Sequence, residues 1–215
     1  MDVFSSHNPW DWSQTVWDGR AATNDQIDTT IADLAEQFPR WSVSSERFAL
    51  LRQFSGILAR RREELVDLLI CEAGKCRADA EAEADLLPTK IDITLNQGLA
   101  RTPLISSGAV IGPASRWRPR GVAVVLGPYN FPLHLLHGLV VPALAVGCTV
   151  AAKPSERCPG LGALYAQLLA EAGLDAFCRV VQGGSEVAGA LIERPEITTV
   201  AAVGGRAMGL AIMRR

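Results

Sequence analysis

Apolar residues recur at helical spacing in three segments of the first hundred residues, with charged residues between them. The first predicted helix is capped by Asn24, the second opens at Ser44 or Ser45 and ends near Gly74, and the third covers residues 77–99. The apolar positions are Ile27, Ile31, Leu34, Ala35 and Phe38 in the first helix, and Phe48, Leu51, Phe54, Ile57, Leu58, Leu65, Leu68 and Leu69 in the second.

After residue 120, short β-branched runs alternate with helical ones. The expected strands are residues 121–126, 148–152, 177–181 and 197–203, and the expected helices are residues 132–147, 161–173, 185–192 and 205–215. Four β–α pairs predict a parallel sheet with right-handed crossovers. The expected class is therefore α/β, with a partial doubly wound, Rossmann-like sheet preceded by an N-terminal helical region.

Charge divides the chain at the same place. Residues 1–120 carry 14 basic and 17 acidic side chains, whereas residues 121–215 carry 7 and 6. The first part is expected to form solvated helices and the second a buried core. Between them, residues 101–120 read as an extended excursion with several turn signals.

Composition narrows the class of protein. With 215 residues, 48% of them hydrophobic, and a net charge of −2, the chain is a soluble globular type without the basic patch that would make nucleic acid its default partner. Residues 121–152 form an uncharged run of bilayer-spanning length, but its prolines and glycines indicate strand, turn and helix instead. The first residues show no export signal, and five cysteines without pairing or metal-ligand spacing fit a reducing cytoplasm.

Four loops fall at the carboxyl ends of the predicted strands, where open parallel sheets bind ligands. They are residues 127–132, 153–156, 182–184 and 204–209. The dinucleotide fingerprint GxGxxG is absent, and each glycine pair alone is most simply a helix-entry turn. Their shared position after successive strands favours a ligand site.

Two of these loops carry polar side chains suited to chemistry. Lys153 and Glu156 follow a buried strand, so a lysine can meet nucleotide hydroxyls or phosphate and a carboxylate can take both ribose hydroxyls; the alternative is a solvated ion pair. Asn130 lies between Pro128 and Pro132, and its amide can donate to a developing oxyanion; the alternative is a turn-forming asparagine.

Other polar residues favour structural roles. His134 and His137 share a helix face without a third ligand nearby, so they are interpreted as packed or pocket-lining, and no metal site is expected. Residues 60–64 read as a solvated helix face, and the cysteines as small core residues.

Several motifs together resemble the aldehyde dehydrogenase superfamily. They are residues 127–132 (GPYNFP), 147–156 (GCTVAAKPSE), 172–174 leading to 180–184 (VVQGG), 204–209, Asn8-Pro9 before Val16-Trp17, Phe38-Pro39-Arg40-Trp41 and Glu72-Ala73-Gly74-Lys75. Tyr129, followed by His134 and Gly138, resembles the succinylglutamate semialdehyde dehydrogenase branch. Several motifs in register across nearly the whole chain make the resemblance specific.

The resemblance implies NAD(P)-dependent oxidation of an aldehyde to a carboxylic acid, with Asn130 as oxyanion donor. It implies that Lys153 and Glu156 hold the adenosine ribose and that the last glycine-rich loop approaches the pyrophosphate. Glu156 would repel a 2′-phosphate, so NAD is expected over NADP. The residues assigned to cofactor binding are Pro128, Tyr129, Lys153, Ser155, Glu156, Gly183, Gly204, Gly205 and Gly209.

It also implies an organisation: residues 1–100 as the helical part of the cofactor domain, 101–120 as an oligomerising hairpin, and 121–215 as a Rossmann-like half that stops before the catalytic domain. The chain departs from the family in Gly205, where a serine is usual, and in having no match for the family's nucleophilic cysteine or general-base glutamate. Most of the family's first hairpin is also expected to be missing.

Two hypotheses follow. One is the cofactor-binding portion of an aldehyde dehydrogenase, inactive alone, which forms homo-oligomers or associates with a related subunit. The other is a non-catalytic nucleotide-binding or interaction remnant.

Overall fold

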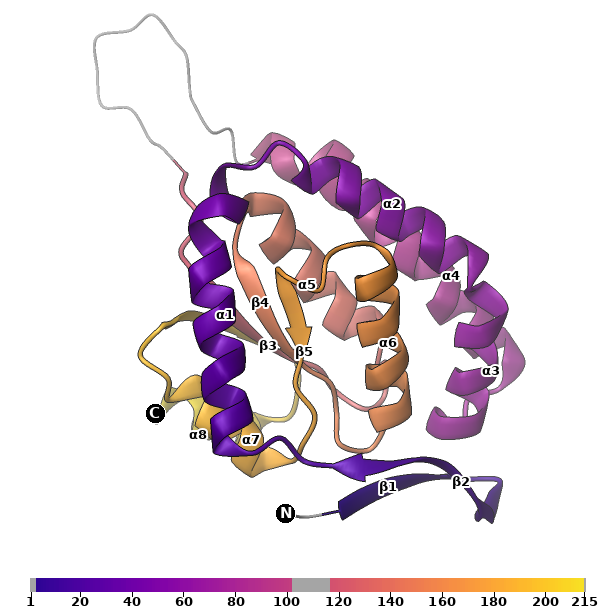
Figure 1. The fold of residues 1–215 in the computed structure, drawn as a ribbon. Helices are drawn as coiled ribbons and strands as arrows, with labels where there is room; N and C mark the ends of the chain where they lie inside the picture. Colours follow the sequence, from indigo (N-terminus) through magenta and orange to yellow (C-terminus); the bar gives the residue numbers. More distant parts are fainter. Residues whose placement is uncertain (1–2, 102–116, 215) are drawn as a thin grey trace, which may run out of the picture.

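Four parallel strands form the centre of the fold, and helices cover both faces of the sheet (Figure 1). The structure is a computed structural model that describes residues 3–101 and 117–214. The strands of the sheet are β3 (Val122–Leu126), β4 (Thr149–Lys153), β5 (Cys178–Val180) and β6 (Ile197–Ala202). The predicted α/β class is confirmed.

The order of the strands is β5-β4-β3-β6, with β3 paired in parallel to both β4 and β6. The chain moves outward from β3 through β4 to β5 and then returns to the other side of β3. A topological switch point therefore lies between β3 and β6, where such sheets bind ligands beyond the carboxyl ends of their strands.

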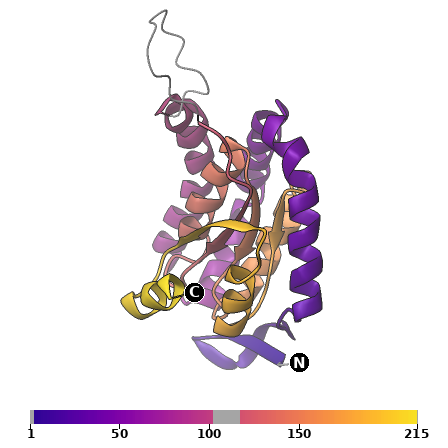
Figure 2. The same cartoon turned by 90° about the vertical axis from the view of Figure 1, so that its left-hand side faces the viewer.

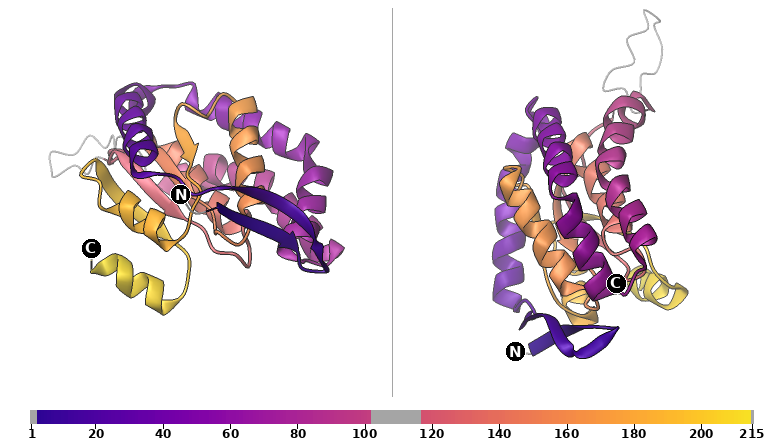
Figure 3. Two further views of the ribbon diagram at one scale, coloured as in Figure 1. Left: turned by 60° about the horizontal axis from the view of Figure 1, so that its bottom comes forward. Right: turned by 90° about the vertical axis from the view of Figure 1, so that its right-hand side faces the viewer.

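The helices form layers on the two faces. Their bounds are α1 (Asn24–Val43), α2 (Arg47–Arg60), α3 (Arg62–Ala73), α4 (Arg77–Ile93), α5 (His134–Val146), α6 (Pro159–Glu171), α7 (Ser185–Ile192) and α8 (Arg206–Met213). One apolar cluster joins α1 and α7 to Val122, Val124 and Ala151 of the sheet. The opposite face packs Val125 and Val150 against α5 and α6, which α2–α4 cover in turn (Figures 1 and 3).

The N-terminal region differs from the sequence prediction. Residues 3–20, for which no strand was predicted, form an antiparallel hairpin of β1 (Val3–Asn8) and β2 (Asp11–Arg20). Strand β2 is mostly exposed and β1 mostly half-buried, and neither shows the alternation of apolar and polar residues by which strands are recognised. The hairpin lies beyond the ends of α3 and α6 (Figure 1).

Helix boundaries also shift. Thr23, rather than Asn24, caps α1: its hydroxyl accepts from the Gln26 N–H, and the Gln26 side chain accepts from the Thr23 N–H in a capping box. The long helix predicted to end near Gly74 breaks at Arg61 into α2 and α3. After α4, residues 94–98 form a π-helical turn and residues 99–101 a 3₁₀ turn. Residues 102–116, most of the predicted excursion, lie outside the described residues.

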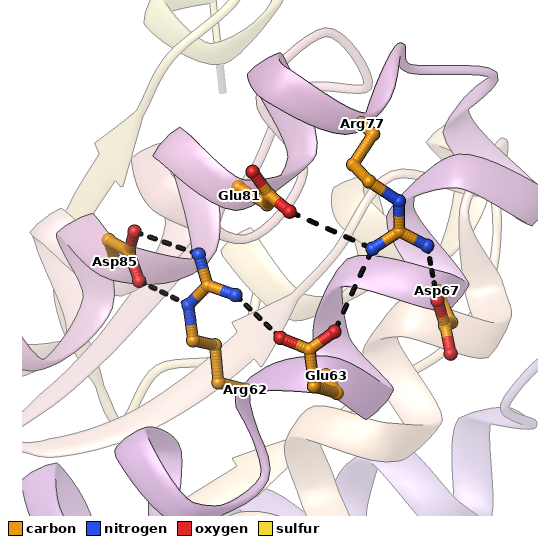
Figure 4. A network of polar contacts seen from close by, with 6 residues as sticks. All are labelled: Arg62, Glu63, Asp67, Arg77, Glu81 and Asp85. Atoms are coloured by element: carbon orange, nitrogen blue, oxygen red, sulfur yellow. Dashed lines mark hydrogen bonds and ion pairs between the residues drawn. The ribbon is translucent and has the colours of Figure 1, made fainter.

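The arginines at the break reach other helices. Arg61 donates to Glu171 of α6 at 2.9 Å, and Arg62 donates to Asp85 of α4 at 2.6 Å. Figure 4 shows how Arg62 and Arg77 extend this into a network whose acidic members are Glu63, Asp67, Glu81 and Asp85. The network is exposed, so its individual ion pairs stabilise the fold weakly. No described helix is long and apolar enough to cross a membrane.

Two buried glutamates cap the helices that follow the site loops. Glu72 of α3 accepts from the N–H groups of Gly160 and Leu161, each at 2.7 Å, at the start of α6, and also from the Ser6 hydroxyl of β1. Glu83 of α4 caps the start of α5 and carries an ion pair at 2.6 Å with the Lys75 ammonium. Burial raises the pKa of Glu72 against the effect of its hydrogen bonds.

We expect Glu72→Ala to lower the free energy of unfolding by about 2–4 kcal/mol, because two N–H groups at the start of α6 lose their acceptor. The matched control is Glu63→Ala on the same helix, where the side chain is 69% exposed and a change of about 1 kcal/mol or less is expected. Urea unfolding followed by circular dichroism measures both values. Equal losses in the two variants would contradict the capping role.

Candidate functional site

The loop after β3 carries Asn130 on an exposed turn. Tyr129, Asn130 and Phe131 are exposed, whereas Pro128 is half-buried. The rings beside Asn130 are held by cations: the Arg157 guanidinium lies 4.6 Å from the Tyr129 ring centroid, and the Lys75 ammonium lies 3.9 Å from that of Phe131. Among the described residues, none forms a hydrogen bond with the Asn130 amide. Its N–H donors are therefore available to a ligand.

Glu83 sets the end of this loop. Its Oε1 accepts from the N–H groups of Leu133 at 3.0 Å and His134 at 2.9 Å, just before and at the start of α5. At the other end of the loop, the Gly127 N–H donates to the Lys153 carbonyl at 2.9 Å. The backbone that carries Asn130 is therefore fixed on both sides and tied to the next loop.

Lys153 is a buried cation at the carboxyl end of β4. Its Nζ donates to the Pro154 carbonyl at 3.0 Å and lies 3.6 Å from Glu156 Oε2, while its side chain is only 6% exposed. Burial lowers the pKa of Lys153, and the negative charges of Glu156 and Glu186 oppose that shift. The alternative prediction was an ion pair in a solvated loop. Glu156 is exposed as that alternative requires, whereas Lys153 is buried.

A cavity of about 550 Å³ opens beside Lys153, between α7 and α8. Figure 3 shows these two helices next to each other, and Figure 2 shows how α8 stands away from the sheet. Leu126 and Gly127 line the cavity from the end of β3, Lys153 and Glu156 from the loop after β4. The helices contribute Ser185, Glu186, Ala188, Gly189, Ile192, Ala207, Met208, Ala211 and Ile212.

The glycines near the cavity differ in what they require. Gly183 has φ +148°, and a Cβ there would lie 2.3 Å from Val187, so this turn tolerates only glycine without rearrangement. Gly205 and Gly209 have nothing within 4 Å of an added Cβ, so they leave open space at the start of α8. A Cβ at Gly204 would meet the flexible end of Met208 instead.

The structure brings some predicted residues together and separates others. Lys153 and Glu156 line the cavity, whereas Pro128, Tyr129, Ser155 and the four glycines do not. Ser155 is buried in a turn, where its hydroxyl accepts from the Arg157 N–H at 3.3 Å. Asn130 lies outside the cavity lining, at the same carboxyl edge of the sheet.

Sequence reasoning missed Glu186 as a lining residue and the two capping glutamates. The signal for Glu186 is its position in the first turn of the helix after Gly183-Gly184. Glu72 and Glu83 each interrupt an apolar helix face, since they are buried at the helical spacing of Leu69 and Leu87. A carboxylate on a buried helix face requires hydrogen-bond donors, and this requirement could have indicated that Glu72 and Glu83 cap other elements.

His137 and three of the five cysteines are buried in the protein interior. His137 is fully buried, and its two ring nitrogens hydrogen-bond to the Tyr165 hydroxyl and the Leu87 carbonyl, both at 2.9 Å, so it is a packed residue as predicted. Cys148, Cys158 and Cys178 are buried as predicted, but Cys76 is exposed. Cys158 lies next to the Asn130 loop, with its Sγ 3.9 Å from the Tyr129 carbonyl, and burial raises the pKa of its thiol to about 12.

The fold, the switch-point cavity and the loop sequences identify the family. The sequence model of the aldehyde dehydrogenase family matches residues 2–215. The chain belongs to the aldehyde dehydrogenase family. Succinylglutamate semialdehyde dehydrogenases are among its relatives, as the motifs around Tyr129 predicted.

The N-succinylglutamate 5-semialdehyde dehydrogenase of Paraburkholderia xenovorans is 38% identical over 199 residues, which are 91% of this chain and 41% of that protein. The enzyme of the same name from Burkholderia mallei is 34% identical over 221 residues, 99% of this chain and 44% of that protein. A 1-pyrroline-5-carboxylate dehydrogenase from Thermus, solved with bound NAD, superposes with a TM-score of 0.92 at 28% identity, over 99% of this chain and 43% of that one. The chain thus spans less than half the length of these family members.

Proposed function

We propose that this chain is the dinucleotide-binding portion of an NAD-dependent aldehyde dehydrogenase that acts on a semialdehyde. The observation that carries the proposal is the cavity at the switch point, where a buried lysine and an exposed carboxylate meet. The Thermus relative was solved with NAD, and the two curated relatives are named for a semialdehyde. These similarities support the same ligand classes here.

The residues present fit a dinucleotide. The cavity has room for a nucleoside, Lys153 and Glu156 face it with donors and an acceptor for ribose hydroxyls, and the bare backbone at Gly205 and Gly209 leaves space for the pyrophosphate. Gly183 permits the tight turn into α7 that forms one wall. Bound NAD would supply the acceptor for the hydride that leaves the substrate.

Asn130 is the residue proposed to act on the substrate. Its exposed amide would donate to the oxygen that becomes negative when a nucleophile adds to the aldehyde carbon. The Glu83 caps and the Gly127–Lys153 hydrogen bond hold its backbone before substrate arrives, so little reorganisation is needed.

The exposed carboxylate of Glu156 favours NAD over NADP. A 2′-phosphate carries negative charge and would lie where the ribose hydroxyls meet this carboxylate.

We also propose a cytoplasmic location, which the five free cysteines support.

Titration calorimetry of the 215-residue chain with NAD⁺ tests the dinucleotide site. We expect saturable binding, and we expect Lys153→Met to weaken it about tenfold or more, because the charged donor is lost while the volume of the side chain is kept. Lys90→Met, outside the cavity, is the matched control and should bind like the parent chain. The absence of binding by the parent chain would contradict the proposal.

A second candidate function, a non-catalytic nucleotide-binding remnant, is favoured by the state of Cys158. This thiol lies beside the Asn130 loop but is buried, and burial raises its pKa, so it is a poor nucleophile. We therefore expect the isolated 215-residue polypeptide to form no NADH with a panel of semialdehydes. Absorbance at the NADH band measures this, and steady NADH production above a protein-free control would show that the chain is catalytic by itself.

The outer side of β6 is the basis for a proposed association. Strand β6 is an edge of the sheet, α8 has no buried residue, and an apolar cavity of about 560 Å³ lies over Ala123, Val125, Thr199 and Ala201. Open parallel edges and apolar faces favour pairing with another chain. We expect the isolated polypeptide to self-associate or to bind a related subunit. Sedimentation velocity at several concentrations measures this, and a concentration-independent monomer that melts cooperatively would contradict it.

A further inference from the structure

We infer that Glu186 is a second carboxylate that selects the cofactor, acting with Glu156 to exclude a 2′-phosphate from the cavity. The inference rests on the proposed function, because it assumes that the cavity between α7 and α8 holds the adenosine part of the cofactor. Glu186 lies in the first turn of α7, on a different loop from Glu156, and lines the same cavity.

The charges that line this cavity do not balance. Lys153 is the one cation among its described lining residues, whereas Glu156 and Glu186 are both acidic. The Lys153 ammonium lies 3.6 Å from Glu156, and no described cation lies within ion-pair distance of Glu186. The cavity lining therefore carries more negative than positive charge, and its one ammonium pairs with Glu156 rather than with Glu186.

Glu186 also occupies the place where an anion would bind. The N–H groups and the dipole at a helix N-terminus attract negative charge. The Glu186 carboxylate folds back over the entry to α7: its Oε2 accepts from the Ser185 hydroxyl at 3.1 Å, and its Oε1 lies 2.6 Å from the position of a Cβ on Gly184. A phosphate at this end of α7 would therefore be repelled by the Glu186 carboxylate, although a helix N-terminus normally offers N–H donors to a phosphate.

A neutral ribose gains from the same arrangement. Carboxylate oxygens only accept hydrogen bonds, and the 2′- and 3′-hydroxyls of a ribose can each donate one. The Glu156 and Glu186 carboxylates line the cavity from the loop after β4 and from α7, and the Lys153 ammonium beside Glu156 adds donors, so the lining suits a vicinal diol. Selection of NAD over NADP is then divided between two residues, and neither alone sets it.

The test compares the affinities for NAD⁺ and NADP⁺ by titration calorimetry of the full chain in its parent form and as Glu186→Gln. We expect Glu186→Gln to change the ratio of the two affinities by roughly tenfold toward NADP⁺, and the change to shrink at high salt, because one charge at short range is removed. Glu186→Lys should shift the ratio further, and Glu186→Asp, which keeps the charge, should restore most of the preference for NAD⁺.

Glu196→Gln is the control: this glutamate is exposed, follows α7 and does not line the cavity, so the ratio should stay at the parent value. A ratio that Glu186→Gln leaves unchanged, or that Glu196→Gln shifts equally, would overturn the inference while NAD⁺ binding itself persists. Loss of NAD⁺ binding by the parent chain would instead overturn the proposed function. Thermal unfolding of each variant shows that the helix is intact.

Discussion

Two buried carboxylates determine where the loops of the candidate site end. Helices α5 and α6 both begin against the layer formed by α2–α4 rather than in water, so the N–H groups of their first turns need acceptors inside the protein. Glu83 and Glu72 supply those acceptors from α4 and α3. Charge-assisted hydrogen bonds offset part of the cost of burying them, and for Glu83 the ion pair with Lys75 adds to this.

This constraint makes the N-terminal helices part of the site, although they carry none of the residues predicted for it. Lys75, between α3 and α4, contacts both Glu83 and the ring of Phe131, which directly follows Asn130, so this connection reaches the loop of the candidate site. The hairpin is tied to the same structure through Ser6 and Glu72. One apolar cluster runs from α2–α4 through α5 and α6 to the sheet. The change in charge composition near residue 120 therefore marks a difference in solvent exposure and not a boundary between two separately packed units.

The strands and helices after residue 121 could be predicted to within a few residues, because buried strands and helix-entry turns leave local patterns. The capping glutamates could not, since Glu72 and Gly160 are 88 positions apart and Glu83 and Leu133 are 50 apart. The ion pairs that Arg61 and Arg62 make at the helix break likewise join residues far apart in the sequence. Lys153 and Glu156, which line the cavity, could be singled out because a charged pair after a buried strand is costly. Glu186, which lines it too, was missed because an exposed glutamate in a first helical turn is ordinary.

The four helices that follow the strands differ in which groups lie at their N-termini, and this difference bears on where an anion could bind. Glu83 and Glu72 take the first N–H groups of α5 and α6, and Glu186 covers the entry to α7. Helices α7 and α8 both lack a side-chain cap, but α8 also has no acidic residue in its first turn, which contains Arg206, and its entry is the open backbone of Gly205. Because free N–H groups and a nearby cation favour phosphate, we propose that the N-terminus of α8 faces the pyrophosphate, while the other three position the surrounding loops.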